Sequence, residues 1–345
     1  MVPVFDGHND VLLRLWLKNS AKAVSHFIEG DGKGHMDLPR MHDGGMCGGL
    51  FAIYTPSDDG LNHDGLNPPL YGAVDRDAAW KATGEMAEIL FGLERETPNG
   101  GFKVCKTVAE IRSSMARGAI AAVFHVEGAE AIGAKLEGLL QLHALGMRSL
   151  GPVWSRQNVF GHGVPFRFPS TPNTGDGLTG AGKDLVRECN ALKIMLDCSH
   201  LNSKGFWDLA KLSNAPLVTS HSNVHTLSQS SRNLMDDQIR AIADSGGLVG
   251  LNYALDFLQD DGVLHPELPP SDMIRHLDHL LRLAGEDCVG LGSDFDGAAI
   301  PDFMKDVSGL PRLVEAMVKA GYNDLLIGKI TSANWLRVLE KTWSQ

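Results

Sequence analysis

Residues 119–127 read AIAAVFHVE, a continuous apolar run that closes with the polar residues His125 and Glu127. An apolar run without polar alternation is typical of a β-strand that is buried on both faces. The run therefore predicts a parallel strand inside a covered sheet, with two polar side chains at the point where the strand ends.

Seven further apolar runs of this kind are spread along the chain, and stretches with helical spacing separate them. The eight predicted strands are Val2–Phe5, Met46–Tyr54, Ala119–Val126, Arg148–Trp154, Ile194–Cys198, Pro216–Thr219, Gly247–Leu251 and Cys288–Leu291. Alternating strands and helices indicate an α/β protein with a parallel sheet, and eight repeats indicate a closed (β/α)8 TIM barrel. The alternative is an open doubly wound sheet, which favours a GxGxxG turn after the first strand, but the sequence there is FDGHND.

Four longer stretches without periodicity interrupt this pattern, and they are rich in Gly, Pro, Asn, Asp or His. They are residues 17–40, 56–75, 158–179 and 256–270. Because all but the first directly follow a strand, we expect them at one end of the barrel. No shift in composition marks a boundary, so we expect residues 1–345 to form a single domain.

The composition excludes several classes of protein. Of the 345 residues, 43% are hydrophobic and 21% are charged, which is ordinary globular usage and excludes disorder. The net charge of −11 with no Lys/Arg cluster argues against nucleic acid or a membrane surface as partner. The N-terminus lacks the pattern of a secretory signal, no apolar run approaches the ~18–20 residues of a membrane span, and the five cysteines lack CxxC spacing. We therefore expect a cytoplasmic protein with free thiols.

Polar side chains that suit metal binding or acid–base chemistry stand at the ends of several predicted strands. They are His8, Asp10, His125, Glu127, Asp197, His200, Ser220, His221, Asp294 and Asp296. The C-terminal ends of the strands in a barrel converge on one mouth, where catalytic residues gather. Imidazoles and carboxylates from five strands are therefore expected to meet in one place.

His8 and Asp10 form the first candidate pair of metal ligands. They are two residues apart, so an extended strand directs both side chains to the same side. Neutral imidazoles and carboxylates are the usual ligands of a catalytic zinc ion. An isolated HxD pattern is weak, but His200 and His221 at later strand ends strengthen it and predict a metal site.

The strand at 119–127 offers two candidates for a ligand that two metals share. Two metals a few ångströms apart need a bridging ligand, and a carboxylate bridges where an imidazole cannot. Glu127 is therefore the best-placed bridge. His125 lies on the same face and stays open, either as a rival ligand or as a residue that supports the ligands.

Two other positions suit the chemistry of a hydrolase. Asp294 ends the last strand, where a carboxylate that is not a ligand can take a proton from metal-bound water. Asp296 has the same strand parity and is the alternative base, and a turn-capping role is the structural alternative for Asp294. Arg232 lies in a loop and can clamp a substrate carboxylate in bidentate fashion, although a solvated surface charge is the commoner role of a loop arginine.

These motifs resemble those of the membrane (renal-type) dipeptidases, metallopeptidase family M19, whose fold is an amidohydrolase-type barrel. The stretches that carry the resemblance are FDGHNDVLLRL, HVEGAEAI, GLTGAGKDLVRECNALKIMLDCSH, VTSHSN, SSRNLMDDQI and VGLGSDFDG. They cover nearly the whole chain in order. The resemblance implies a zinc-dependent dipeptidase in which a metal-bridging hydroxide attacks the peptide bond, with tolerance of a D-residue at the C-terminal position of the dipeptide.

The resemblance also assigns roles to single residues. It implies two zinc ions per chain, held by His8, Asp10 and Glu127, and by Glu127, His200 and His221. It implies that Asp294 is the general acid and base and contacts substrate, and that Arg232 anchors the free carboxylate of a dipeptide. We also expect a homodimer.

Trp154 departs from the family pattern. In RSLGPVWSRQN it stands where family members such as the renal enzyme have a histidine that touches substrate and the tetrahedral intermediate. An indole has one N–H donor, no acceptor and no titration, so we expect a narrower substrate pocket that favours side chains able to pack on a ring. The alternative for Trp154 is a place in the barrel wall away from substrate.

Two other functions stay open. The departure at Trp154 supports another binuclear hydrolase of this barrel type, acting on N-acyl amino acids, lactones or cyclic amides. A metal-loaded binding protein without turnover is the third hypothesis, and the complete set of candidate ligands together with a candidate base argues against it.

Overall fold

The computed structural model describes residues 1–57 and 72–344. Its strands are β1 (Val4–Asn9), β2 (Met46–Tyr54), β3 (Phe102–Val104), β4 (Ile120–Glu127), β5 (Ser149–Gly151), β6 (Met195–Leu196), β7 (Val218–Thr219), β8 (Leu248–Leu251) and β9 (Val289–Leu291). Each predicted strand overlaps one of these. The additional strand, β3, has only three residues, too few for a periodic pattern, and it pairs beside the start of β4.

The strands close into a barrel. Parallel ladders join β1–β2–β4–β5–β6 in one sheet and β7–β8–β9 in a second. Single parallel bridges, Asp197 with Val218 and Asn9 with Phe295, connect the two sheets at both of their edges. Two backbone hydrogen bonds strengthen the second connection, from Asp294 N to His8 O at 3.0 Å and from Asp10 N to Phe295 O at 2.8 Å. The predicted (β/α)8 barrel is confirmed.

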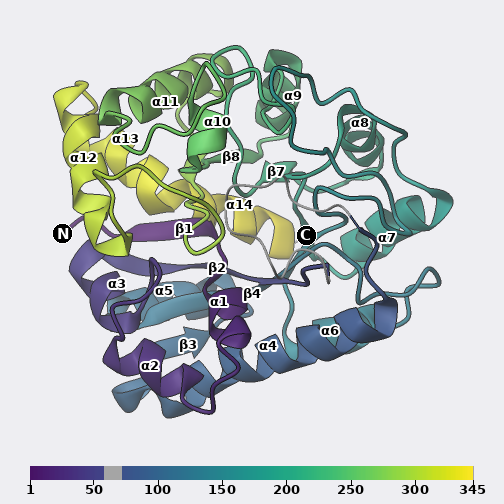
Figure 1. The fold of residues 1–345 in the computed structure, drawn as a ribbon, viewed down its shortest axis with the longest axis horizontal. Helices are drawn as coiled ribbons and strands as arrows, with labels where there is room; N and C mark the ends of the chain where they lie inside the picture. The colour runs from purple at the N-terminus through teal and green to yellow at the C-terminus, as the bar shows by residue number, and fades with distance from the viewer. Residues whose placement is uncertain (58–71, 345) are drawn as a thin grey trace.

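Helices lie around the outside of the strands (Figure 1). They are α1 (Val11–Leu17), α2 (Ala23–Glu29), α3 (Leu38–Gly44), α4 (Arg76–Glu96), α5 (Val108–Ala116), α6 (Leu139–Leu145), α7 (Gly180–Ala191), α8 (Ser203–Leu212), α9 (Asp236–Asp244), α10 (Leu255–Leu258), α11 (Pro270–Ala284), α12 (Leu310–Lys319), α13 (Asp324–Gly328) and α14 (Asn334–Trp343). Two 3₁₀ turns (Pro98–Gly100 and Val307–Gly309) and a π-helical turn (Lys329–Ala333) complete the described elements.

The stretch 17–40 is less irregular than the sequence suggests. It contains α2 and the start of α3, where Asp37 accepts a hydrogen bond from Arg40 N and Pro39 occupies the first turn. Both helices have seven residues, about two turns, so their apolar spacing is too short to be recognised as periodic. Most of the predicted irregular stretch 56–75 lies outside the described residues.

The end of the barrel opposite the strand C-termini is filled by the C-terminal helix. α14 contacts β8 and β9, and its Trp335 is fully buried and donates from Nε1 to Leu291 O at 2.9 Å. A side chain at Gly7 would collide with this indole ring, so the first strand needs glycine there. The interior below the mouth is therefore packed, which leaves the C-terminal ends of the strands to hold a site.

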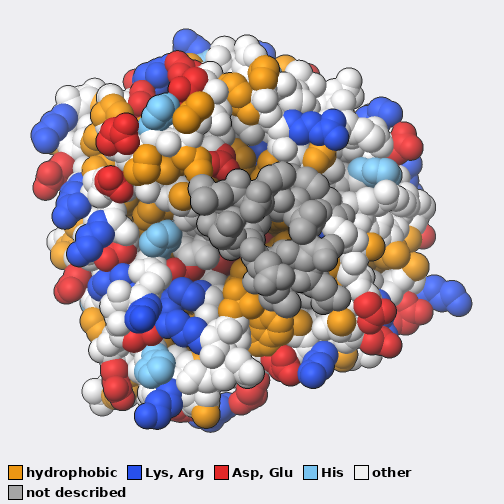
Figure 2. All heavy atoms as spheres, viewed as in Figure 1, with side chains coloured by type: hydrophobic (Ala, Val, Ile, Leu, Met, Phe, Trp, Pro, Cys, Tyr) orange, Lys and Arg blue, Asp and Glu red, His pale blue; other side chains and the backbone are white. Residues whose placement is uncertain are grey.

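The surface carries charged side chains of both signs, as the composition indicates. On the face that Figure 2 shows, Lys and Arg side chains are interspersed with Asp and Glu side chains. Within residues 1–57 and 72–344, no helix combines the length and apolarity needed to span a membrane.

Candidate active site

Three imidazoles converge on one carboxylate oxygen at the mouth of the barrel. The Nε2 atoms of His200, His221 and His8 lie 2.9, 3.5 and 3.6 Å from Glu127 Oε1. Asp10 Oδ2 lies 3.3 Å from His8 Nε2, and all five side chains are buried. The structure thus brings together the five residues that the sequence predicts to be metal ligands.

The strands determine this convergence. The pleat of β1 directs His8 to the mouth, and Asp10 follows at the start of α1. Glu127 is the last residue of β4, and His221 follows β7 closely. The rings of His8 and His221 stack at 3.8 Å between centroids, so these side chains hold one another in place.

Serine hydroxyls orient the two histidines that come from the second half of the chain. Ser155 Oγ lies 2.7 Å from His200 Nδ1, and Ser220 Oγ lies 2.7 Å from His221 Nδ1. Because each Nδ1 is engaged, the Nε2 atoms are the ones that face Glu127. Ligands of a metal are commonly oriented through their second ring nitrogen in this way.

The charges at this place favour a bound cation. Burial lowers the pKa values of His200 and His221 well below the usual range, so both rings are neutral, as metal ligands must be. Burial also raises the pKa of Glu127 well above its usual range. Burial opposes protonation of His8, but the carboxylates of Glu127 and Asp10 outweigh it and raise the pKa of His8 to about 10. The buried carboxylates therefore draw positive charge to this position.

Unpaired atoms show where such a cation fits. Nδ1 of His8 and Oδ1 of Asp10 are buried without a hydrogen-bond partner among the described residues, and Nε2 of His8 contacts only carboxylate oxygens, Asp10 Oδ2 at 3.3 Å and Glu127 Oε1 at 3.6 Å. Atoms of His8, Glu127 and His221, and likewise of His8, Asp10 and Asp294, lie close enough together to hold a metal ion. Imidazole and carboxylate donors in this arrangement fit divalent metals such as zinc.

His125 lies beneath the ligands. Its Nδ1 is 2.8 Å from Ser149 Oγ, its Nε2 is 3.7 Å from Asp197 Oδ2, and its ring meets that of His8 edge-on. Burial lowers the pKa of His125 to about 4, so the ring is neutral. Glu127, not His125, faces all three imidazoles.

Asp294 borders the cluster at the seam between β9 and β1. Its Oδ2 accepts a hydrogen bond from Asn252 Nδ2 at 2.9 Å, and burial raises the pKa of its carboxyl. A side chain at Gly297 would collide with the carboxylates of Asp10 and Asp294, so only glycine lets the following turn pass this close to them.

Asp296 is directed elsewhere. Its Oδ2 accepts from Arg14 Nε at 2.9 Å and its Oδ1 from His35 N at 2.5 Å. Both oxygens are therefore occupied by the segment that follows β1. Of the two carboxylates that the sequence offers as a base, Asp294 is the one beside the cluster.

Arg232 is buried, in contrast to an ordinary loop arginine. Its Nη1 donates to Ser222 Oγ and its Nη2 to His221 O, both at 2.9 Å. Its Nε is buried without a partner, and none of the described carboxylates pairs with it. Burial lowers its pKa to about 10, so it stays charged at neutral pH. A buried guanidinium that lacks a carboxylate can accept one from a ligand.

Trp154 lies directly beside a candidate ligand. Its ring is partly exposed and stacks on His200, with 5.6 Å between centroids and 29° between planes. Phe166 and Tyr54 contact its edges, and the guanidinium of Arg156 lies 5.3 Å from its ring centroid. The structure thus places Trp154 at the mouth of the barrel.

Several residues that support the candidate ligands and Asp294 were not predicted from the sequence. Ser155 and Arg156 follow Trp154 directly, and Asn252 directly follows β8. Their positions at strand ends are a signal, but serine, arginine and asparagine occur at strand ends for many reasons. Only the structure shows that Ser155 meets His200 and that Asn252 meets Asp294.

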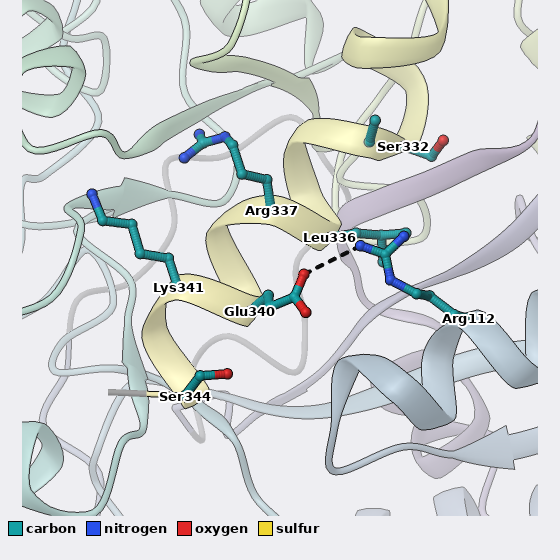
Figure 3. Close-up of a pocket in the computed structure, with 8 residues that line it drawn as sticks. Arg112, Ser332, Leu336, Arg337, Glu340, Lys341 and Ser344 are labelled. Atoms are coloured by element: carbon teal, nitrogen blue, oxygen red, sulfur yellow. Dashed lines mark hydrogen bonds and ion pairs between the residues drawn. The ribbon is translucent and has the colours of Figure 1, made fainter.

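A cavity of about 710 Å³ lies at the other end of the barrel, along α14 (Figure 3). Its polar lining is engaged within the fold. Arg112 pairs with Glu340 at 3.2 Å, Arg337 donates to the backbone oxygens of residues 246, 247 and 287, and Lys341 donates to Ser245 O. These contacts tie α14 to the start of β8 and present no catalytic group.

Comparisons with known proteins bear on the whole chain. A family model described as membrane dipeptidase (peptidase family M19) matches residues 1–344. A metallo peptidase from Rhodobacter sphaeroides, solved with a phosphinate mimic of the dipeptide L-Ala-D-Ala, is 53% identical, with a TM-score of 0.95 and 99% of each chain covered.

Two further proteins show the same likeness. The solved dipeptidase AC, a metallo peptidase, is also 53% identical, with a TM-score of 0.94, and the match covers 100% of this chain and 99% of that one. A protein from Klebsiella pneumoniae, described as an uncharacterized protein in the pqqA 5′ region, is 46% identical over 246 residues, which are 71% of this chain and 91% of that protein.

Proposed function

The chain belongs to the membrane dipeptidase family, peptidase family M19, and on this premise we propose that it is a zinc-dependent dipeptidase whose site measures the length of its substrate. It is a metallodipeptidase by family and by its structural neighbours. One observation supports the zinc-dependent dipeptidase in particular. The mouth of the barrel contains both a cluster of side chains that can bind metal and a buried Arg232 that has no carboxylate partner among the described residues.

Two zinc ions are proposed to share the carboxylate of Glu127. His8 and Asp10 would complete one binding set, and His200 and His221 the other. When bound, the pair would supply Lewis acidity, which lowers the pKa of a water molecule and polarises the peptide carbonyl. The neutral rings of His200 and His221 and the unpaired atoms of His8 and Asp10 support this assignment.

Asp294 is proposed to move the proton. Asn252 holds one of its oxygens, which leaves the other to exchange a proton between the attacking water and the departing amine. Burial raises the pKa of Asp294, which brings its carboxyl closer to the range where it can both accept and release a proton.

Arg232 is proposed to bind the free C-terminal carboxylate of the dipeptide. Because the cation is fixed by Ser222 and by the backbone of His221, its distance from the metals is fixed too. A tripeptide would place its carboxylate beyond this position. Binding of the C-terminal carboxylate does not depend on the configuration of the neighbouring side chain, which supports tolerance of a C-terminal D-residue. The L-Ala-D-Ala mimic bound to the Rhodobacter protein supports it too.

The decisive experiment is a substrate panel with zinc-reconstituted protein. We expect hydrolysis of L,L- and L,D-dipeptides and little hydrolysis of tripeptides. Preferential turnover of N-acyl amino acids, lactones or cyclic amides would replace the dipeptidase proposal with the other binuclear hydrolase. Stoichiometric metal without turnover of any of these would favour a binding protein.

Arg232→Met should raise KM for dipeptides by roughly tenfold to a hundredfold, because a charge-assisted bond contributes about 1.5–3 kcal/mol. A dipeptide amide has no carboxylate, so its kinetics should change much less. Steady-state kinetics on a dipeptide and on its amide give the comparison. Equal losses on both would assign Arg232 a structural role through Ser222 and His221.

Trp154→His should reorder the substrates more than it changes the best kcat/KM. The indole stacks on His200 and borders the mouth, so a smaller, polar ring there should admit side chains that the indole excludes. The measurement is kcat/KM across dipeptides that differ at one side chain, with thermal unfolding as a control for folding. An unchanged profile in a folded variant would place Trp154 outside the substrate pocket.

A further inference from the structure

Asp197 is a buried carboxylate to which the proposed mechanism gives no role. It directly follows β6 and is 3% exposed. Its Oδ1 accepts hydrogen bonds from Ser199 N at 3.0 Å, from Ser199 Oγ at 2.7 Å and from Ser220 N at 2.8 Å. Its Oδ2 accepts from Ser220 Oγ at 2.5 Å. Oδ1 therefore accepts from three donors, whereas Oδ2 accepts from the hydroxyl of Ser220.

Ser220 connects this carboxylate to a candidate metal ligand. A serine hydroxyl has one proton to donate, and an ionised carboxylate only accepts. The hydroxyl proton of Ser220 is therefore directed to Asp197 Oδ2. Toward His221 Nδ1, 2.7 Å away, Ser220 can then only accept, so that Nδ1 must carry the ring proton.

The consequence falls on the other nitrogen of His221. A histidine that binds a metal is neutral, so a proton on Nδ1 leaves Nε2 with a free lone pair. Nε2 is the atom that faces Glu127 Oε1 and His200 Nε2, at 3.5 and 3.0 Å. The tautomer that metal binding requires is thus the one that the chain Asp197–Ser220–His221 selects.

We propose that Asp197 is a positioning residue that acts through Ser220 to hold His221 in its metal-binding tautomer. This inference rests on the proposed metal site of the dipeptidase and extends it to a residue outside the proposed set of ligands. Ser199 holds the Asp197 carboxylate in this orientation because it donates to Oδ1, which leaves Oδ2 to accept from the hydroxyl of Ser220.

Asp197→Asn is the sharpest test, because the structure dictates how the amide must sit. The three donors at Oδ1, two of them backbone N–H groups, require an oxygen there, so the new NH₂ group takes the place of Oδ2. It donates to Ser220 Oγ, whose own proton is then free to turn to His221 Nδ1. This reverses the chain and places the ring proton of His221 on Nε2, where it opposes a metal.

We expect Asp197→Asn to weaken one of the two metals by roughly tenfold to a hundredfold, as is usual when a partner of a metal ligand is changed. The measurement is competition for zinc between the holoprotein and a chromophoric chelator. Asp306→Asn is the matched control, since Asp306 is also buried and accepts from Ser308 N and Oγ, but lies away from the cluster. This control should keep both metals at their original affinity.

A double-mutant cycle separates the relay from a general loss of structure. Ser220→Ala removes the connection, so Asp197→Asn in that background should change metal affinity by about twofold or less. The same loss with and without Ser220 would overturn the proposal, as would unchanged metal affinity in folded Asp197→Asn. If Asp197→Asn does not fold, Ser220→Ala alone must weaken one metal, and unchanged affinity there would also overturn it. Because metal affinity is measured without substrate, these outcomes are independent of whether dipeptides prove to be the substrate.

Discussion

Asp294→Asn is expected to keep both metals and to lower kcat by about 10²–10⁴-fold, the usual contribution of a positioned general acid or base. An amide is close in shape to the carboxylate and can still bond to Asn252, but it cannot accept a proton from water or pass one to the amine. The loss should appear in kcat more than in KM, because substrate binding through Arg232 is unaffected. Metal content and dipeptide kinetics on the same preparation measure both effects.

Asp296→Asn is the matched control for that prediction. Asp296 has the same backbone region, with φ of +67° against +62° for Asp294, but its carboxylate pairs with Arg14. Its replacement should lower thermal stability and leave kcat nearly unchanged. Loss of metal in Asp294→Asn would place Asp294 among the ligands, and comparable activity losses in both variants would make the effect one of loop structure.

Glu127→Gln is expected to release one or both metals and to abolish most of the activity. Three imidazole nitrogens lie within 2.9–3.6 Å of Glu127 Oε1, so this carboxylate is common to both proposed binding sets. A neutral amide is a poor metal ligand and cannot bridge with two anionic oxygens. Metal content after dialysis, by elemental analysis, gives the result directly.

Glu130→Gln serves as the control for that prediction. Glu130 is three residues further along the chain and is also buried, but it pairs with Arg156 Nε at 2.9 Å. Its replacement should leave the metal content unchanged. A Glu127→Gln protein that keeps a single tightly held ion and full activity would contradict the binuclear proposal.

The barrel and the candidate ligands could be predicted from the sequence because both depend on local order. Strands buried on both faces form continuous apolar runs, and the residue after each run is at the mouth by topology alone. His8, Glu127, His200 and His221 stand at such places, so their convergence follows once the barrel is assumed. In the structure the Nε2 atoms of the three histidines lie within 3.6 Å of Glu127 Oε1.

The residues that support the ligands could not be predicted in the same way. The contact of Ser155 with His200 joins loops after β5 and β6, and that of Asn252 with Asp294 joins positions after β8 and β9. Such contacts depend on side-chain rotamers and on the path of each loop, which no periodicity records. The choice of Asp294 over Asp296 likewise needed the observation that Arg14 and the backbone of His35 occupy the latter.

The seam between β1 and β9 joins the first and last strands of the barrel, and the proposed metals would lie beside it. There the barrel is held by the bridge of Asn9 with Phe295, by the two backbone hydrogen bonds that flank it and by the hydrogen bonds that Ser293 donates to Asp6. A bound ion that touches His8 and Asp10 binds the closed barrel and not an opened one, so it stabilises closure by mass action, by about 2.7 kcal/mol at a hundredfold excess over its Kd. Removal of the metals should therefore lower the thermal stability of the protein as well as abolish its turnover, because the seam between the first and last strands loses this contribution.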